Sequence, residues 1–203
     1  ADTLDQQKFI ESDGVLPFKT ISEDELTLTY GDETAGGGLQ SLYLNNEAHV
    51  IELANRVSNG FVYILEDVMT PLTQSVYERL CEPERPFQLF REAVEATGLD
   101  KRIHTIYQDT VDSNGMPITL KRNYTVVAVS DDVYRQEGIN SLQDLVAKLE
   151  AGNDYTSPSN ALYQYVAYHI LSGAYNLGKM QAFDTDDATS KNWETLNTEA
   201  LIK

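Results

Sequence analysis

The sequence predicts an α+β fold, in which the strand-rich regions 17–70 and 103–129 form an antiparallel β-core and the helices are segregated to one side. Apolar and polar residues alternate in short runs through the first 70 residues, as they do in half-buried strands. Near residue 73 the spacing changes to apolar residues three and four apart, which is typical of amphipathic helices. Strand-like runs return between residues 103 and 129, so strands and helices occupy different stretches of the chain.

The first part of the chain predicts a series of short strands joined by turns. These strands are expected at 17–21, 25–30, 41–44, 48–53 and 61–65. Gly36-Gly37-Gly38 predicts a mobile loop, and Asn45-Asn46 predicts a tight connection. Asn59-Gly60 is a strong hairpin turn signal before the last of these strands.

The second part predicts helices around a further strand pair. Helices are expected at 75–80, 87–94 and 131–150, and strands at 103–109 and 117–129. Gly98 is expected to end the helix before it as a C-terminal cap. Ala161 to Leu171 is apolar on most sides, which predicts a buried helix or a helix-to-strand element that ends at Gly173.

The charge balance restricts the kind of partner. The 203 residues include 32 Asp and Glu against 15 Lys and Arg, which gives a formal net charge of −17. Such a surface repels phosphate backbones and anionic head groups, so we expect no nucleic-acid partner and no direct binding to an anionic membrane. It suits a protein that meets cations or neutral ligands.

Cysteine usage and hydropathy add further expectations. Cys81 is the only cysteine, so we expect no intrachain disulfide, and the Glu residues around it predict an inert thiol. No apolar run approaches the roughly 20 residues of a membrane helix, and no basic start precedes an apolar core. We expect the signal and any lipid anchor of an exported protein to lie outside this sequence.

No motif in the sequence predicts an enzyme. The patterns GxSxG, HExxH and GxxxxGKS/T are absent. His49, His104 and His169 lie in separate apolar-flanked segments, whereas a zinc site needs two histidines close together with a carboxylate. The acidic run 184–187 is expected to be a solvated loop. We therefore expect no catalytic residue, no cofactor and no metal site.

The end of the chain is similar to its beginning, which predicts an internal repeat. The similar residues pair Trp193 with Phe18, Thr195 with Thr20, Leu196 with Ile21, Glu199 with Asp24, and Leu201 with Leu26. The chain is therefore expected to cover one full repeat, entered partway through a unit.

Four segments resemble blocks of fasciclin-like (beta-Ig-H3/fasciclin) adhesion domains. Residues 124–134 are similar to the first signature block, and 162–173, which contains Tyr168-His169, is similar to the Tyr-His block. Residues 59–71 resemble the block that closes such a domain, and 87–99 resemble its opening helices. The resemblance covers most of the chain and implies a twisted antiparallel β-core with helices on one side.

The blocks occur in an unusual order, because the closing block precedes the opening helices. The resemblance therefore implies part of a tandem array, with residues 1–72 as the C-terminal half of one domain and 73–203 as the N-terminal part of the next. Either half alone would expose strand edges and apolar faces. We expect the halves to pack like one circularly permuted domain, within one chain or swapped between two copies as a homodimer.

The resemblance also implies where a ligand binds. In similar animal domains a Tyr-His pair takes part in receptor adhesion, which marks Tyr168 and His169 as candidate binding residues. Leu162 and Val166 share the helical face of His169, which favours a packing role for this histidine. The sequence departs from the family pattern where Tyr134 replaces the usual Phe, and the partner specificity of animal members is not carried over.

Together these expectations describe a non-catalytic adhesion or binding module on the outside of a cell. The resemblance implies a lipid-anchored bacterial surface protein with tandem domains and a protein or polysaccharide partner. The 12 tyrosines would suit such contacts.

Two alternatives stay open. A carbohydrate-binding accessory module of a glycan-uptake system would present a platform of Tyr or Trp side chains, whereas an architectural spacer would have no ligand.

Overall fold

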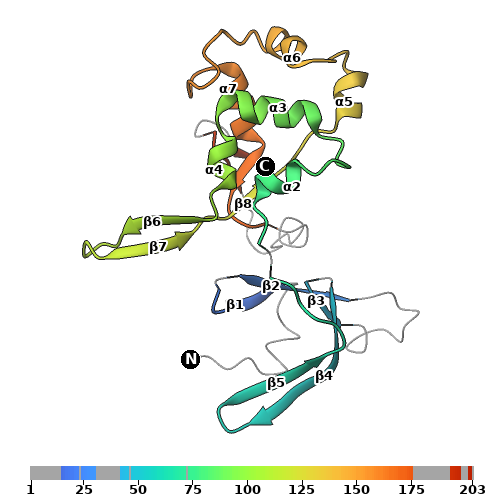
Figure 1. Cartoon of the computed structure of the whole chain (residues 1–203), viewed down its shortest axis with the longest axis vertical. Coiled ribbons are helices and arrows are strands. Elements are labelled where there is room, and N and C mark those ends of the chain that lie inside the picture. The colour runs from blue at the N-terminus through green and yellow to red at the C-terminus, as the bar shows by residue number, and fades with distance from the viewer. Residues whose placement is uncertain are drawn as a thin grey trace, which may run out of the picture. The chain divides into compact units, whose positions relative to one another are not determined.

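A computed structural model gives the arrangement of the chain in two compact units, which divide between Leu72 and Thr73. It describes residues 15–22, 24–30, 42–45, 47–71, 73–175, 193–197 and 201–202. Unit 1 contains the described residues before this division, and unit 2 contains those after it. Figure 1 shows strands in unit 1 and a mixture of helices and strands in unit 2. Every strand pair in the described part is antiparallel, so the predicted α+β class is confirmed.

Unit 1 is a five-stranded sheet whose strands pair in chain order. The strands are β1 (Val15–Lys19), β2 (Glu25–Tyr30), β3 (Leu42–Leu44), β4 (Ala48–Val57) and β5 (Gly60–Leu65). Every predicted strand of this region is present, but β1 ends at Lys19, so Ile21, which was predicted to belong to it, lies exposed in the turn before β2. The β4–β5 hairpin turns at the predicted Asn59-Gly60 signal. The predicted Gly36–Gly38 loop lies outside the described residues.

The alternation of polarity gives unit 1 one apolar face. The cross-strand partners Leu28 and Leu44 are both buried, and Leu16, Leu42 and Val50 complete the same small cluster. The end of β4 leaves this core. The register of β4 against β5 shifts around Ala54, which has a φ of 52°. Leu53 still packs against the cluster, whereas residues 55–57 beyond this bulge are exposed.

Unit 2 contains all the described helices, none of which is long and apolar enough to cross a bilayer. The helices are α2 (Val76–Leu80), α3 (Gln88–Thr97), α4 (Asp100–His104), α5 (Asp131–Gln136), α6 (Leu142–Lys148) and α7 (Ala161–Tyr168). The strands form pairs: β6 (Tyr107–Val111) with β7 (Pro117–Lys121), β8 (Tyr124–Val126) with β9 (Ile170–Ser172), and β10 (Trp193–Glu194) with β11 (Leu201–Ile202).

Two expectations for this region need correction. The strand predicted from Ile103 begins only at Tyr107, because Ile103 belongs to α4 and its buried side chain joins the core of unit 2. The strands of 103–129 also do not share a sheet with those of 17–70. The β-structure is divided among separate sheets instead of forming one common core.

The core of unit 2 lies between α3 and α7. Phe90 and Val94 of α3 and Leu162 and Val166 of α7 are completely buried. The two residues of each helix are four positions apart, so they lie on one face, which is apolar. The predicted cap at Gly98 is confirmed, since this glycine ends α3 with a left-handed φ of 73°.

A capping box begins α2 and connects it to α4. The Ser75 hydroxyl accepts a hydrogen bond from the Glu78 backbone N–H, and the Glu78 carboxylate accepts one from the Ser75 backbone N–H. These hydrogen bonds hold the pKa of Glu78 below its ordinary value. The buried Ser75 hydroxyl also contacts Nδ1 of His104 at 2.9 Å. One side chain therefore begins a helix and joins it to its neighbour.

We expect Ser75→Ala to lower the free energy of unfolding by about 1 to 2 kcal/mol, because it removes the cap and a hydrogen-bond partner of His104. Urea denaturation followed by circular dichroism measures this change. Ser113→Ala, at an exposed turn position, is the matched control and should leave stability unchanged. Equal stability of the two variants would contradict the role of the cap.

Candidate functional site

The two residues that the sequence marked, Tyr168 and His169, lie where α7 passes into β9. Tyr168 is the last residue of α7 and is 36% exposed. His169 is the C-cap of that helix and is half-buried. Its backbone carbonyl accepts a hydrogen bond from the N–H of Val127, which extends the pairing of β8 with β9. The neighbours therefore have different environments, one exposed and one held in the fold.

The His169 ring packs among aromatic side chains. Its ring centroid lies 4.6 Å from that of Tyr165, 5.6 Å from Phe90 and 5.8 Å from Tyr168. Nδ1 donates a hydrogen bond to the backbone carbonyl of Tyr165 at 2.8 Å, so the proton of the neutral ring lies on Nδ1. This geometry agrees with the packing role that the helical spacing favoured. A binding role for the Tyr168–His169 pair stays a prediction.

A pair of tyrosine hydroxyls lies beside this cluster. The hydroxyls of Tyr134 and Tyr165 are 2.8 Å apart. Burial is the main cause that raises the pKa of each phenol above its ordinary value, so both are protonated at neutral pH. The buried Tyr134 hydroxyl therefore has a partner within the fold. The pair can hold α5 and α7 together by a hydrogen bond, and it supplies no anion at neutral pH.

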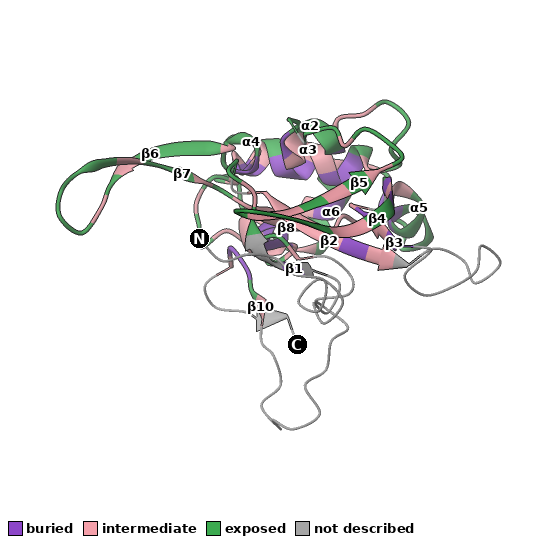
Figure 2. Ribbon diagram, turned by 90° about the horizontal axis from the view of Figure 1, so that it is seen from below, coloured by how far each residue is buried: buried purple, intermediate pink, exposed green. Residues whose placement is uncertain are grey.

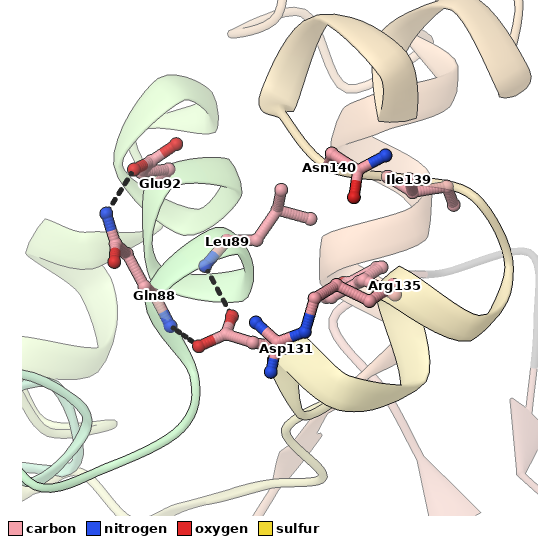
Figure 3. A pocket seen from close by; sticks show the side chains of 8 residues that line it. Gln88, Leu89, Glu92, Asp131, Arg135, Ile139 and Asn140 are labelled. Carbon is pink, nitrogen blue, oxygen red and sulfur yellow. Dashed lines mark hydrogen bonds between the residues drawn. The ribbon is translucent and has the colours of Figure 1, made fainter.

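A small pocket of about 190 Å³ lies between α3, α5 and the loop after α5, as Figure 3 shows. Its lining residues are Gln88, Leu89, Glu92, Asp131, Tyr134, Arg135, Ile139 and Asn140. The Asp131 carboxylate accepts hydrogen bonds from the backbone N–H groups of Gln88 at 3.1 Å and Leu89 at 3.0 Å. These bonds cap α3, whose own N-cap Phe87 has no side-chain acceptor.

The charged groups of this pocket already have partners within the chain. Asp131 is occupied by the helix terminus, and Arg135 forms an ion pair with Asp132. The Asn140 amide donates to the carbonyl of Gly138. The way in which α5 caps α3 therefore accounts for this pocket, and its lining groups do not indicate a ligand.

A second cleft, which the sequence interpretation missed, is lined by basic residues. It has a volume of about 600 Å³ and lies between the end of α4 and the starts of β6 and β8. Its lining residues are Lys101, Arg102, Thr105, Gln108, Arg122 and Tyr124. One sequence pattern could have indicated this cleft: Lys101-Arg102 and Lys121-Arg122 are the only adjacent basic residues in the sequence. We call this feature the basic cleft.

The histidines have separate partners. Nδ1 of His49 lies 2.9 Å from the Glu66 carboxylate in unit 1, whereas His104 contacts Ser75 in unit 2. Among the residues that the structure describes, no group of three His, Cys, Asp or Glu side chains is placed to hold a metal ion. The acidic run 184–187 lies outside those residues.

We expect His169→Ala to lower the free energy of unfolding by about 2 to 3 kcal/mol, because it removes ring contacts and a hydrogen bond at a half-buried position. Tyr168→Ala should change it by less than about 1 kcal/mol, because this side chain is exposed. Chemical denaturation of both variants makes the comparison. An equal loss in the two variants would contradict the different roles of these neighbours.

Comparison with known proteins gives one similar solved structure of interest. No protein-family model and no curated protein sequence matches the chain. The chain is similar to a FAS1 domain pair from the insect cell adhesion molecule fasciclin I, with 14% sequence identity and a TM-score of 0.40. The match covers 96% of this chain, which spans 60% of the length of that chain. The likeness is one of fold alone and carries no inference about function.

Proposed function

We propose that this chain is a non-catalytic binding module that adheres to a protein ligand. The resemblance of its sequence blocks to fasciclin-like adhesion domains motivates the proposal, and the β6–β7 hairpin is the observation that supports it. This hairpin is a two-stranded sheet, and no other described strand pairs with either of its edges. Figure 1 shows it extending away from the helices of unit 2, and Figure 2 shows it exposed over most of its length.

The exposed side chains of the hairpin favour contact with a partner. Tyr107 and Val111 are four positions apart in β6 and therefore lie on the same face. They are 58% and 62% exposed, and Met116 beside the turn is 62% exposed. Exposed apolar residues gathered on one element are typical of interaction surfaces, and an isolated two-stranded hairpin is marginally stable by itself. A bound partner would cover these side chains and stabilise the hairpin.

We place this module on the outside of a cell, in a lipid-anchored bacterial surface protein with tandem domains. Residues 1–72 would be the second half of one fasciclin-like domain, and 73–203 the first part of the next. The matching residues Thr20 and Thr195 support a repeat. Each follows a strand and precedes its antiparallel partner. Each hydroxyl also accepts a hydrogen bond from a backbone N–H of its loop, but the donor is four residues further on at Asp24 (3.0 Å) and two residues further on at Asn197 (3.2 Å).

If the two halves pair between copies, the chain forms a swapped homodimer. We expect light scattering at high micromolar concentration to give twice the 22.7 kDa mass of one chain, and dilution to restore the single mass. Burial of strand edges and apolar faces would drive this association. A single-chain mass at every concentration would contradict the swapped form.

The adhesion proposal is tested with beads that carry the chain. We expect such beads to attach to layers of fibronectin or mucin more than bare beads do. Val111→Thr together with Met116→Gln should reduce attachment at least tenfold, because it removes the exposed apolar contacts and keeps the β-propensity of position 111.

Val127→Thr is the matched control for this experiment. Val127 is also exposed, at 44%, but it lies outside the hairpin, so its isosteric replacement should leave attachment unchanged. Attachment no stronger than that of bare beads would favour the architectural spacer. Equal losses in the control and the hairpin variant would exclude the hairpin as the contact surface.

A further inference from the structure

We propose that the basic cleft of unit 2 binds the carboxylate or sulfate of a sparsely charged acidic saccharide. This inference deepens the proposed binding function by naming a second ligand class, and it rests on that function only in taking the chain to be a binding module. The site is separate in its residues from the apolar side chains of the β6–β7 hairpin tip.

In the part of unit 2 that the structure describes, the three cations of the cleft differ from five other cations in having no internal counter-ion. Elsewhere in the unit, five cations form ion pairs: Arg79 and Arg85 with Glu82, Arg91 with Glu95, Arg135 with Asp132, and Lys148 with Glu137. Within the described part of the chain, no carboxylate lies within ion-pair distance of Lys101, Arg102 or Arg122. In a chain of net charge −17, cations that face one another without an acid suit an external anion.

The hairpin brings these cations together. The end of α4 leads directly into β6, and β7 returns to the same place because Tyr107 pairs with Lys121. The backbone N–H of Arg122 then donates to the carbonyl of Ile106 at 2.7 Å. Arg122 therefore lies beside the residues that follow Lys101 and Arg102 along the chain.

The remaining lining groups match a sugar. The Arg122 Nε–H donates to the amide oxygen of Gln108 at 2.7 Å, which leaves the Gln108 NH₂ group to donate to a ligand. The Thr105 hydroxyl donates to the carbonyl of Lys101 at 2.8 Å and can still accept a hydrogen bond from a sugar hydroxyl. The half-buried ring of Tyr124 adds an apolar face of the kind that packs against a pyranose ring.

The negative charge around the cleft favours a sparsely charged saccharide over a dense polyanion as the ligand. A nucleic acid or a heavily sulfated polymer would extend beyond the cleft and meet the strongly negative remainder of the protein, which repels it. A saccharide with isolated acidic groups places one anion in the cleft and neutral rings outside it. The size of the cleft, about 600 Å³, is sufficient for one or two sugar rings.

The test uses the whole chain with glucuronosyl-xylobiose, a trisaccharide that carries one carboxylate and two neutral rings, and with its methyl ester, which has the same sugar rings without the charge. Isothermal titration calorimetry should show saturable binding of the acidic trisaccharide and at least tenfold weaker binding of the ester. Inorganic sulfate alone should also bind at least tenfold more weakly, because it lacks the rings. Equal affinity for the acid and the ester, equal affinity for sulfate, or no binding of the acidic trisaccharide at millimolar concentration would each overturn the proposal.

Matched variants localise the binding. Arg102→Gln and Lys101→Gln each remove one exposed cation from the cleft and should weaken binding of the acidic trisaccharide about tenfold, the loss of one charge-assisted hydrogen bond. Lys148→Gln removes the same charge from α6 and should leave the affinity unchanged. An equal loss in Lys148→Gln would show a general charge effect and contradict the cleft.

A final variant separates this proposal from the adhesion proposal. The Val111→Thr and Met116→Gln double variant should bind the acidic trisaccharide with unchanged affinity, because neither residue lines the cleft. Loss of bead attachment with saccharide binding intact supports two independent surfaces. Loss of saccharide binding in this variant would contradict the assignment of the ligand to the basic cleft.

Discussion

The packing of α3 against α7 is the interaction on which the rest of unit 2 depends. The Phe90 side chain is completely enclosed there, and a buried aromatic residue of this size contributes about 3 to 5 kcal/mol. This is a large fraction of the roughly 5 to 15 kcal/mol that stabilises a typical domain. The N-terminus of α3 is capped by Asp131 of α5, and α7 leads through His169 into β9. The helix pair therefore positions the pocket, the aromatic cluster and the β8–β9 sheet together.

Electrostatics divides the surface of unit 2 into two kinds of region. Most of its described cations form exposed ion pairs, which contribute little to stability but neutralise a strongly acidic surface locally. The basic cleft is different, because Lys101, Arg102 and Arg122 converge with no acid among its lining residues. A chain whose average charge disfavours anions can therefore still offer one anion a favourable place, since the potential at a site depends on its nearest charges.

The candidate site was predictable only in part. The helical spacing of Leu162, Val166 and His169 indicated that this histidine packs inward, and the structure encloses its ring among aromatic residues. The Phe90 contact and the Tyr134–Tyr165 hydroxyl pair could not be predicted, because these partners come from helices far apart in the chain. The basic cleft was missed for a similar reason. Its three cations belong to two Lys-Arg pairs that are visible in the sequence, but only the β6–β7 hairpin brings Arg122 to Lys101 and Arg102.

The α+β class, the strands of unit 1, the turn at Asn59-Gly60 and the end of α3 at Gly98 could all be predicted, because each follows from local periodicity or from a local backbone preference. The helical state of Ile103, the capping of α3 by Asp131 and the division of the strands among separate sheets could not be predicted from local patterns. Contacts between distant segments settle these features. The same short apolar run can be buried equally well in a strand or in a helix, so its neighbours in space make the choice.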